Sequence, residues 1–300
     1  MNKKLFFALL FLATTFSVSA QLLYKITGKG LEKPSYILGT QHLAPISFVD
    51  QIPGLHDALN SAEQVYGELV MDSMMTMEAT QKMQAAMMLP EGQSLTTLLS
   101  KDQLDRLNAY LKANIGADLT NPMMAQQLGA MTPAGLSMQL SLLMAVRHVQ
   151  GFDPQNLFDA YFQKKAKEQN KPVGGFETVD FQVRVLYGAP IERQIVQLMC
   201  FVDNATIQEE TLVSLLNAYA AQNLEKTHEA IEMKLGNECD QTPEERANLI
   251  DNRNLAWIKV MPQIMQEKST FFAVGAGHLL GEKGVLTLLK AAGYTITPVS

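Results

Sequence analysis

A glycine-rich segment near the C-terminus, residues 271–284, constrains the fold more than any other part of the sequence. It opens with an apolar, uncharged run over 271–274 and continues as Gly-Ala-Gly-His, ending at His278. Two further glycines, at 281 and 284, precede an amphipathic pattern that starts at 285. The segment predicts a buried strand, a tight turn and a helix.

Buried strands of α/β sheets usually present binding sites at their carboxyl ends, so His278 is expected at the mouth of a site. The glycines around it allow another group to approach the imidazole closely. The alternative is a glycine-rich turn that contains a histidine by chance, because a single Gly-x-x-His is a weak motif.

A second copy of the motif lies far upstream. Residues 36–45 form an apolar strand pattern followed by Gly39-Thr40-Gln41-His42, a small apolar stretch and a proline. Two histidines this far apart can share one ion if their strands are neighbours in a sheet, because ligands gather in space rather than in sequence. His42 and His278 are therefore candidate metal ligands.

Two further predicted strands carry acids. Strand 64–70 has Glu68 inside an otherwise apolar run, and the segment 172–178 ends at Glu177 just before a helix. A buried carboxylate requires a cation or hydrogen-bond donors, which makes both glutamates candidates for a site. The alternatives are that Glu68 faces water on an edge strand and that Glu177 complements the dipole of the following helix.

The first 20 residues have the pattern of a secretory signal. Lys3 and Lys4 precede an apolar run over 5–12, and a small-residue cleavage site ends at Ala20, before Gln21. The run is too short to span a bilayer, so we expect no integral membrane segment after cleavage and a periplasmic or secreted location. Loss of two lysines takes the formal charge from −6 to −8. A mildly acidic chain without a basic block is a poor partner for nucleic acid.

The order of elements predicts an α/β protein with a mixed central sheet flanked by helices. We expect a single domain over 21–300, with 90–170 as a helical insertion, because no good strand pattern lies in that stretch. The predicted strands are 22–26, the segment ending near His42, 64–70, 172–177, 271–274 and 294–299. The predicted helices are 48–62, 71–88, 102–113, 122–130, 133–149, 154–169, two within 191–234, 242–266 and 285–292.

The sulfur-containing residues leave alternatives open. Cys200 and Cys239 are the only cysteines, and in an oxidising compartment they can pair or remain two buried thiols. Residues 71–88 are dense in methionine, which favours irregular packing or a substrate-facing groove over a cuprous copper site, since no histidine is interleaved. The remaining histidines are not expected to be ligands. His56 is interpreted as a surface or helix-face residue, His148 as structural or surface-exposed, and His228 as part of a solvated face.

Together these residues suit one kind of chemistry. Two neutral imidazoles, His42 and His278, with the carboxylate of Glu68 match the ligands of Zn, Mn, Co or Fe(II), and an open position on such an ion activates water. A second carboxylate, Glu177, can serve as general base. Arg253, on the predicted helix 242–266, can contact a carboxylate or a developing oxyanion, or is one more helix-surface arginine.

The same motifs resemble the TraB/GumN family over most of the chain, from about residue 22 to 299. The resemblance is carried by the two Gly-x-x-His turns, the Glu68 strand, Glu177-Thr178, Arg253-Asn254, and Gly281 with Gly284. That family is related to the TIKI metalloproteases, which cleave Wnt proteins, and more distantly to erythromycin esterase and the haem-binding ChaN proteins. The resemblance implies a mixed α/β sheet and, as in the TIKI branch, peptidase activity that depends on Mn or Co.

By the same resemblance, His42, His278 and Glu68 correspond to the family's histidines and glutamate, and Glu177 and Arg253 to further family positions. The sequence therefore predicts an exported metallohydrolase acting on a peptide or small-molecule substrate. A periplasmic protein that binds haem or a peptide in the same cleft without turnover is the alternative, and an inactive scaffold is a third reading.

Overall fold

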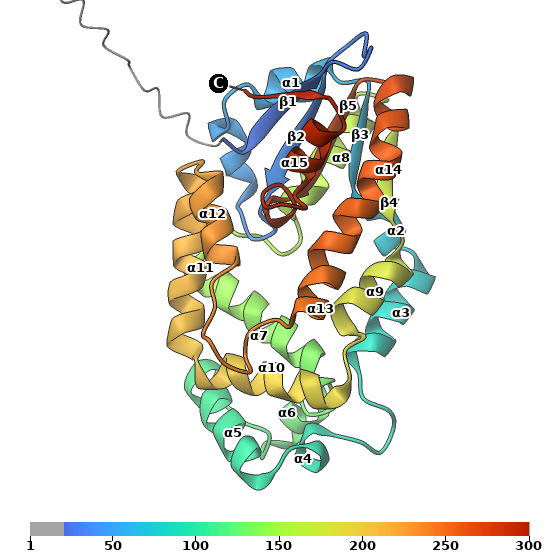
Figure 1. Cartoon of the computed structure of the whole chain (residues 1–300). Coiled ribbons are helices and arrows are strands. Elements are labelled where there is room, and N and C mark those ends of the chain that lie inside the picture. Colours follow the sequence, from blue (N-terminus) through green and yellow to red (C-terminus); the bar gives the residue numbers. More distant parts are fainter. Residues whose placement is uncertain (1–20, 300) are drawn as a thin grey trace, which may run out of the picture.

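The computed structural model describes residues 21–299 and contains a mixed six-stranded sheet (Figure 1). The spatial order of the strands is β4-β3-β5-β2-β1-β6. Their bounds are β1 Leu23–Thr27, β2 Ser35–Thr40, β3 Gln64–Leu69, β4 Val173–Glu177, β5 Thr270–Gly275 and β6 Thr295–Pro298. The predicted fold class, a mixed α/β sheet flanked by helices, is confirmed. The predicted signal lies outside the described residues.

Four neighbouring strands, β4, β3, β5 and β2, run parallel to one another. The hairpin partner β1 is antiparallel to β2, and β6 is antiparallel to β1. In this register Thr40 lies opposite Gly275, and Leu69 lies opposite Glu177. The carboxyl ends of the four parallel strands therefore meet at one edge of the sheet, which is where such sheets place their sites.

Helices cover the sheet and extend beyond its carboxyl edge. Figure 1 shows the sheet in the upper part of the molecule, with α4 to α7 and α10 in the lower part. The α-helices are α1 Leu55–Ser61, α2 Met71–Met74, α3 Met77–Met87, α4 Leu95–Leu98, α5 Lys101–Ile115, α6 Pro122–Gln127, α7 Pro133–His148, α8 Phe158–Glu168, α9 Val179–Tyr187, α10 Ile191–Asp203, α11 Ala205–Ala220, α12 Leu224–Ile231, α13 Pro243–Arg246, α14 Asn252–Glu267 and α15 Val285–Ala291. Shorter turns are 3-10 at Ile46–Gln51 and Ala276–His278 and π-helical at Ala247–Asp251.

Two hydrophobic clusters hold these layers together. The larger one surrounds the sheet and includes Phe271 and Phe272 of β5, Trp257 of α14, and Phe158 of α8. The smaller one joins α4, α5, α7 and α10 and is built largely from leucines and methionines. Within the predicted insertion 90–170, α8 thus packs on the sheet while α4, α5 and α7 pack with α10. The single domain and the insertion boundary stay predictions.

Several predicted helices are divided in the structure. The helix predicted over 48–62 is wrong, because Pro53 and Gly54 separate a 3-10 turn from α1, and Gly54 has a positive φ of 66°. The methionine-rich helix divides at Thr76, whose hydroxyl caps α3. The stretch 191–234 forms three helices rather than two. Across residues 21–299, the helices are all too short or too polar to span a bilayer.

The two cysteines form a disulfide that joins α10 to the connection between α12 and α13. Replacing both Cys200 and Cys239 by serine is expected to lower the free energy of unfolding by about 4 kcal/mol, because the bridge closes a 39-residue loop that restricts the unfolded chain. Urea denaturation measures the difference. A reducing agent should lower the stability of the wild type by a similar amount and leave the double variant unchanged; equal stability of the two proteins would contradict the prediction.

Candidate active site

The sheet edge brings together residues that are far apart in the sequence. Glu177 ends β4, Glu68 lies one residue before the end of β3, His278 follows β5, and His42 follows β2. Because these strands are adjacent and parallel, their carboxyl ends line up in that order. Arg253 reaches the same edge from the first turn of α14. All five predicted site residues therefore gather at one place.

The His42 ring is held by Asp159, the second residue of α8. Its Nδ1 lies 2.7 Å from Asp159 Oδ2, and the other carboxylate oxygen accepts a hydrogen bond from the Thr40 hydroxyl. Since a carboxylate only accepts, Nδ1 of His42 carries a proton. In the neutral ring the lone pair is then on Nε2, the atom that points toward Gly275.

The His278 ring is fixed on both sides and is buried. The side-chain amide nitrogen of Asn254 donates to the backbone carbonyls of His278 and Lys283, at 3.1 and 2.9 Å, so its oxygen faces the ring. His278 Nδ1 donates to that oxygen over 2.7 Å. Nε2 must then accept, and Arg253 Nη1 lies 3.1 Å from it. Trp257 packs against the same ring, with centroids 4.4 Å apart.

Arg253 is the centre of the hydrogen-bond network. Its Nε and Nη2 form a bidentate pair with Glu177, at 2.7 and 3.0 Å, and Nη2 also bonds to Glu68 Oε2. Its Nη1 donates to the Leu249 carbonyl, within the π-helical turn that precedes α14, as well as to His278. The guanidinium therefore bridges both candidate carboxylates and one candidate imidazole, and only 6% of its side chain is exposed.

The two glutamates differ in how fully they are engaged. Both oxygens of Glu177 accept from Arg253, and Oε1 also accepts from the Trp257 indole at 2.9 Å. Glu68 Oε1 accepts from the Gly275 amide at 2.9 Å and lies 3.8 Å from His278 Nε2. Gln182 of α9 donates to both glutamates. The free acceptor capacity of the pair is therefore on Glu68 Oε1.

Burial and charge set the protonation states. Burial lowers the pKa of the His278 imidazole to about 3, so this ring is neutral at pH 7. For Glu68, burial by itself raises the pKa, but the surrounding His278, Arg253 and His42 outweigh it and bring the pKa to about 2. Because the His278 ring is neutral at pH 7, the Arg253 guanidinium is the main permanent cation of the site.

His42 differs from His278 because a carboxylate faces it. Asp159 raises the pKa of His42 above its ordinary value of 6.5. The ring is 63% exposed, so water screens this attraction. A ligand role for His42 therefore requires that its Nε2 proton be released when the ion binds.

Gly275 has no side chain, and the small space that its Cβ would fill is bordered by the three candidate ligands. A Cβ at this position would lie 3.2 Å from Glu68 Oε1, 3.6 Å from His278 Cδ2 and 3.9 Å from His42 Nε2. Two imidazole nitrogens and one carboxylate oxygen are suitable donors for a divalent ion. Within residues 21–299, however, no three acidic, histidine or cysteine side chains are spaced as a preformed metal site. An ion in this space would have to replace the hydrogen bond between Arg253 and His278.

Replacing Gly275 by alanine is expected to weaken metal binding by at least about tenfold, because the methyl group would occupy the space between the donors. The backbone at Gly275 has φ −52°, which alanine adopts without strain, so any fall in the melting temperature should come from the close contact between the methyl group and Glu68 Oε1. Gly277→Ala is the matched control, since a Cβ there meets only ordinary contacts at 3.6 Å or more. Calorimetric titration with Mn²⁺ compares the three proteins, and equal affinities would contradict the prediction.

Sequence reasoning missed several residues of the site. Asp159 has the appearance of an ordinary acid in the first turn of a helix, and nothing near it in sequence indicates a contact with His42. The local sequence around Asn254, Gln182 and Trp257 likewise gives no sign of their contacts with His278 and the two glutamates. Two histidines that were not predicted as ligands, His56 and His148, lie outside the site. His56 pairs with Asp50, and His148 lies near Glu209. His228, expected on a solvated face, has a buried Nδ1 without a hydrogen-bond partner in the described part of the chain.

Comparison with known proteins assigns the chain to a family. The model of the TraB/PrgY/gumN family matches residues 22–298, nearly the whole chain. The chain belongs to this family. The match includes both Gly-x-x-His turns and every strand that contributes to the site.

Similar curated proteins include TIKI metalloproteases. The chain is 26% identical to Metalloprotease TIKI1 of Xenopus tropicalis, over 88% of this chain and 59% of that protein. It is 25% identical to human Metalloprotease TIKI1, over 88% and 60% of the two lengths, and 24% identical to Metalloprotease TIKI2 of Danio rerio, over 88% and 58%. The chain thus spans about three-fifths of the length of these relatives. No solved structure matches it.

Proposed function

We propose that this member of the TraB/PrgY/gumN family is an exported, metal-dependent peptide hydrolase whose ion is held by His42, His278 and Glu68. The observation that carries the proposal is the space beside Gly275, which is bordered by two imidazoles and the one carboxylate oxygen with free acceptor capacity. The names of the TIKI relatives support a metalloprotease, and the disulfide agrees with an oxidising compartment.

The proposed ligand atoms are Nε2 of His42, Nε2 of His278 and Oε1 of Glu68. A divalent ion bound there, Mn, Co or Zn, supplies Lewis acidity toward water and a peptide carbonyl. Asp159 and Asn254 keep the Nδ1 protons of the two rings in place, so that both Nε2 atoms face the ion. His42, the exposed member, lies on the side from which a substrate enters.

Arg253 and Glu177 have different proposed roles. If the lone pair of His278 Nε2 were given to a bound ion, Arg253 Nη1 would lose that acceptor and would be available to a negatively charged oxygen of the substrate. Glu177, originally a candidate general base, is proposed instead to position Arg253, because both of its oxygens already accept hydrogen bonds from the guanidinium. This arrangement holds the arginine rigidly at the site.

Chelator treatment followed by return of Mn²⁺ or Co²⁺ tests the proposal, with cleavage of a peptide library read by mass spectrometry. We expect no cleavage after chelation and restored cleavage with metal. A non-catalytic binding protein for haem or a peptide is the second candidate, favoured by the hydrogen bond from Arg253 to His278 Nε2, which engages a proposed ligand atom with a side chain of the protein. Binding of peptide or haem without cleavage under any metal would select that candidate and overturn the hydrolase.

Asp159→Asn is expected to weaken Mn²⁺ binding by roughly 10–100-fold, as is usual when the partner of a metal-bound histidine is changed. The amide is neutral and can turn its nitrogen toward the ring, so it no longer fixes the Nδ1 proton of His42. Thr40→Val is the control, because it removes the other hydrogen bond of Asp159 and leaves His42 untouched. If both variants bound Mn²⁺ equally well, Asp159 would have no part in orienting the ligand.

A further inference from the structure

A cleft of about 770 Å³ lies between the helical layer and the α12 to α13 connection. It is lined by α7, the end of α9, α10, α11, α12 and both cysteines of the disulfide. Ligand pockets for small organic groups have volumes of roughly 300–1,000 Å³, so the cleft has room for one large side chain with its neighbouring backbone.

The cleft collects large apolar side chains that are not buried by the fold. Met138, Leu186, Ile231 and Met233 all line it, and each is about 39–46% exposed. Soluble proteins rarely expose several apolar side chains together. A concave surface that groups them therefore indicates a binding site. Methionine adapts its shape to different partners, which suits a site that accepts more than one residue type.

Charge contributes little to what the cleft can recognise. Arg246 is paired with Glu232 and Asp251, and the carboxylate of Asp240 accepts from two backbone amides. Among the charged residues that line the cleft, Lys234 alone makes no such contact in the described part of the chain. The exposed apolar groups therefore define the preferred ligand.

Two contacts connect the cleft to the candidate active site. On α9, Gln182 donates to Glu68 and Glu177, and Leu186 lies one helical turn further on, which places their Cβ atoms roughly 5–6 Å apart. On α12, Ile231 lies 3.6 Å from the Cβ position of Gly277, the neighbour of His278. The wall of the cleft thus adjoins residues of the candidate active site on two sides.

We propose that this cleft receives a large apolar side chain, such as leucine, methionine or phenylalanine, of the peptide bound beside the Gly275 space. The inference names the class of residue that lies next to the cleaved bond, and in this respect it rests on the proposed function. The claim that an apolar side chain binds in the cleft depends only on the cleft and not on cleavage. The occupant is a peptide side chain rather than a free lipid or haem, because two residues of the cleft wall, Leu186 and Ile231, adjoin the site through Gln182 and Gly277, so one extended chain can reach both places.

Methyl-labelled methionine provides the binding test, with Met138→Leu used to assign the signal of Met138. The probes are the blocked dipeptides acetyl-Leu-Leu-amide and acetyl-Asp-Asp-amide, added to metal-free protein. We expect the methyl signals of Met138 and Met233 to shift with the leucine probe and not with the aspartate probe. Unshifted signals, or a stronger response to the aspartate probe through Lys234, would overturn the inference whether or not the protein cleaves peptides.

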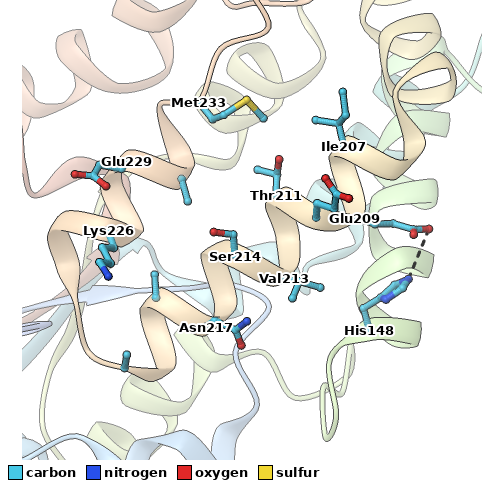
Figure 2. Close-up of a pocket in the computed structure, with 14 residues that line it drawn as sticks. His148, Ile207, Glu209, Thr211, Val213, Ser214, Asn217, Lys226, Glu229 and Met233 are labelled. Carbon is cyan, nitrogen blue, oxygen red and sulfur yellow. Dashed lines mark ion pairs between the residues drawn. The ribbon is translucent and has the colours of Figure 1, made fainter.

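The cleavage test uses Mn²⁺-loaded protein and a peptide library. Large apolar residues should be enriched at one position beside the cut, and Leu186→Gln should lower kcat/KM for such peptides by about tenfold. Val213→Gln is the matched control: Val213 is 40% exposed and lines the adjoining groove between α11 and α12 (Figure 2), but not the cleft itself. Equal losses in both variants would overturn the inference. If the wild type cleaved no peptide but the methionine signals shifted, only the proposed hydrolase function would be overturned.

Discussion

A His42→Ala variant is expected to lose metal binding by more than about 100-fold and to lose peptide cleavage with it. Removal of a ligand costs more than the roughly 10–100-fold that follows from changing the partner of a ligand. The side chain is 63% exposed, and its hydrogen bond is to Asp159, so the fold should tolerate its loss. Calorimetric titration with Mn²⁺ gives the affinity, and thermal unfolding without metal gives the stability.

His56→Ala is the matched control for this variant. His56 is also an exposed histidine paired with an aspartate, Asp50, at 2.8 Å, and it lies outside the site. Its removal should leave both affinity and turnover unchanged. Stoichiometric, tight metal binding by His42→Ala would show that the ion is held by other residues.

An Arg253→Met variant is expected to be destabilised by about 3–5 kcal/mol in the absence of metal. The substitution leaves Glu68 and Glu177 side by side in a buried site without their shared cation, and breaking a buried pair from one side leaves an uncompensated charge. Denaturation in urea at pH 7.5 measures the loss. Adding Glu177→Gln to this variant should recover part of it, because one unpaired carboxylate becomes neutral.

The stability of the same variant is expected to depend on pH in the opposite direction to that of the wild type. In the wild type the pKa of Glu68 is lowered to about 2 from 4.5, so its contribution is present above pH 4.5 and is lost as the pH falls toward 2. Without Arg253, burial of Glu68 is less well compensated and its pKa rises, so the cost of keeping this carboxylate ionised grows as the pH rises. The difference between variant and wild type should therefore be smaller at pH 4.5 than at pH 7.5, and a constant difference would contradict this account.

The sequence indicated the sheet edge well because local patterns encode it. Apolar strands that end in Gly-x-x-His placed His42 and His278, and the acid inside the strand 64–70 placed Glu68; adjacent parallel strands then brought them together. The mixed α/β fold and the family were predicted correctly for the same reason.

The partners of these residues could not be predicted from local patterns. Asp159 contacts His42 across 117 positions, and Arg253 contacts Glu68 across 185, and neither contact has a local periodicity. Arg253 illustrates the difference most clearly. Its sequence context offered a helix-surface arginine or a site residue, whereas the fold makes it the hub of both carboxylates and His278.

The position of a bound ion tests the central claim most directly. Crystals of the protein soaked in Mn²⁺ and measured near the manganese absorption edge should show one anomalous peak, beside Gly275, between His42 Nε2, Glu68 Oε1 and His278 Nε2. Arg253 Nη1 should then have moved away from His278. A map with no peak there, and with the Arg253 to His278 hydrogen bond intact, would contradict the account.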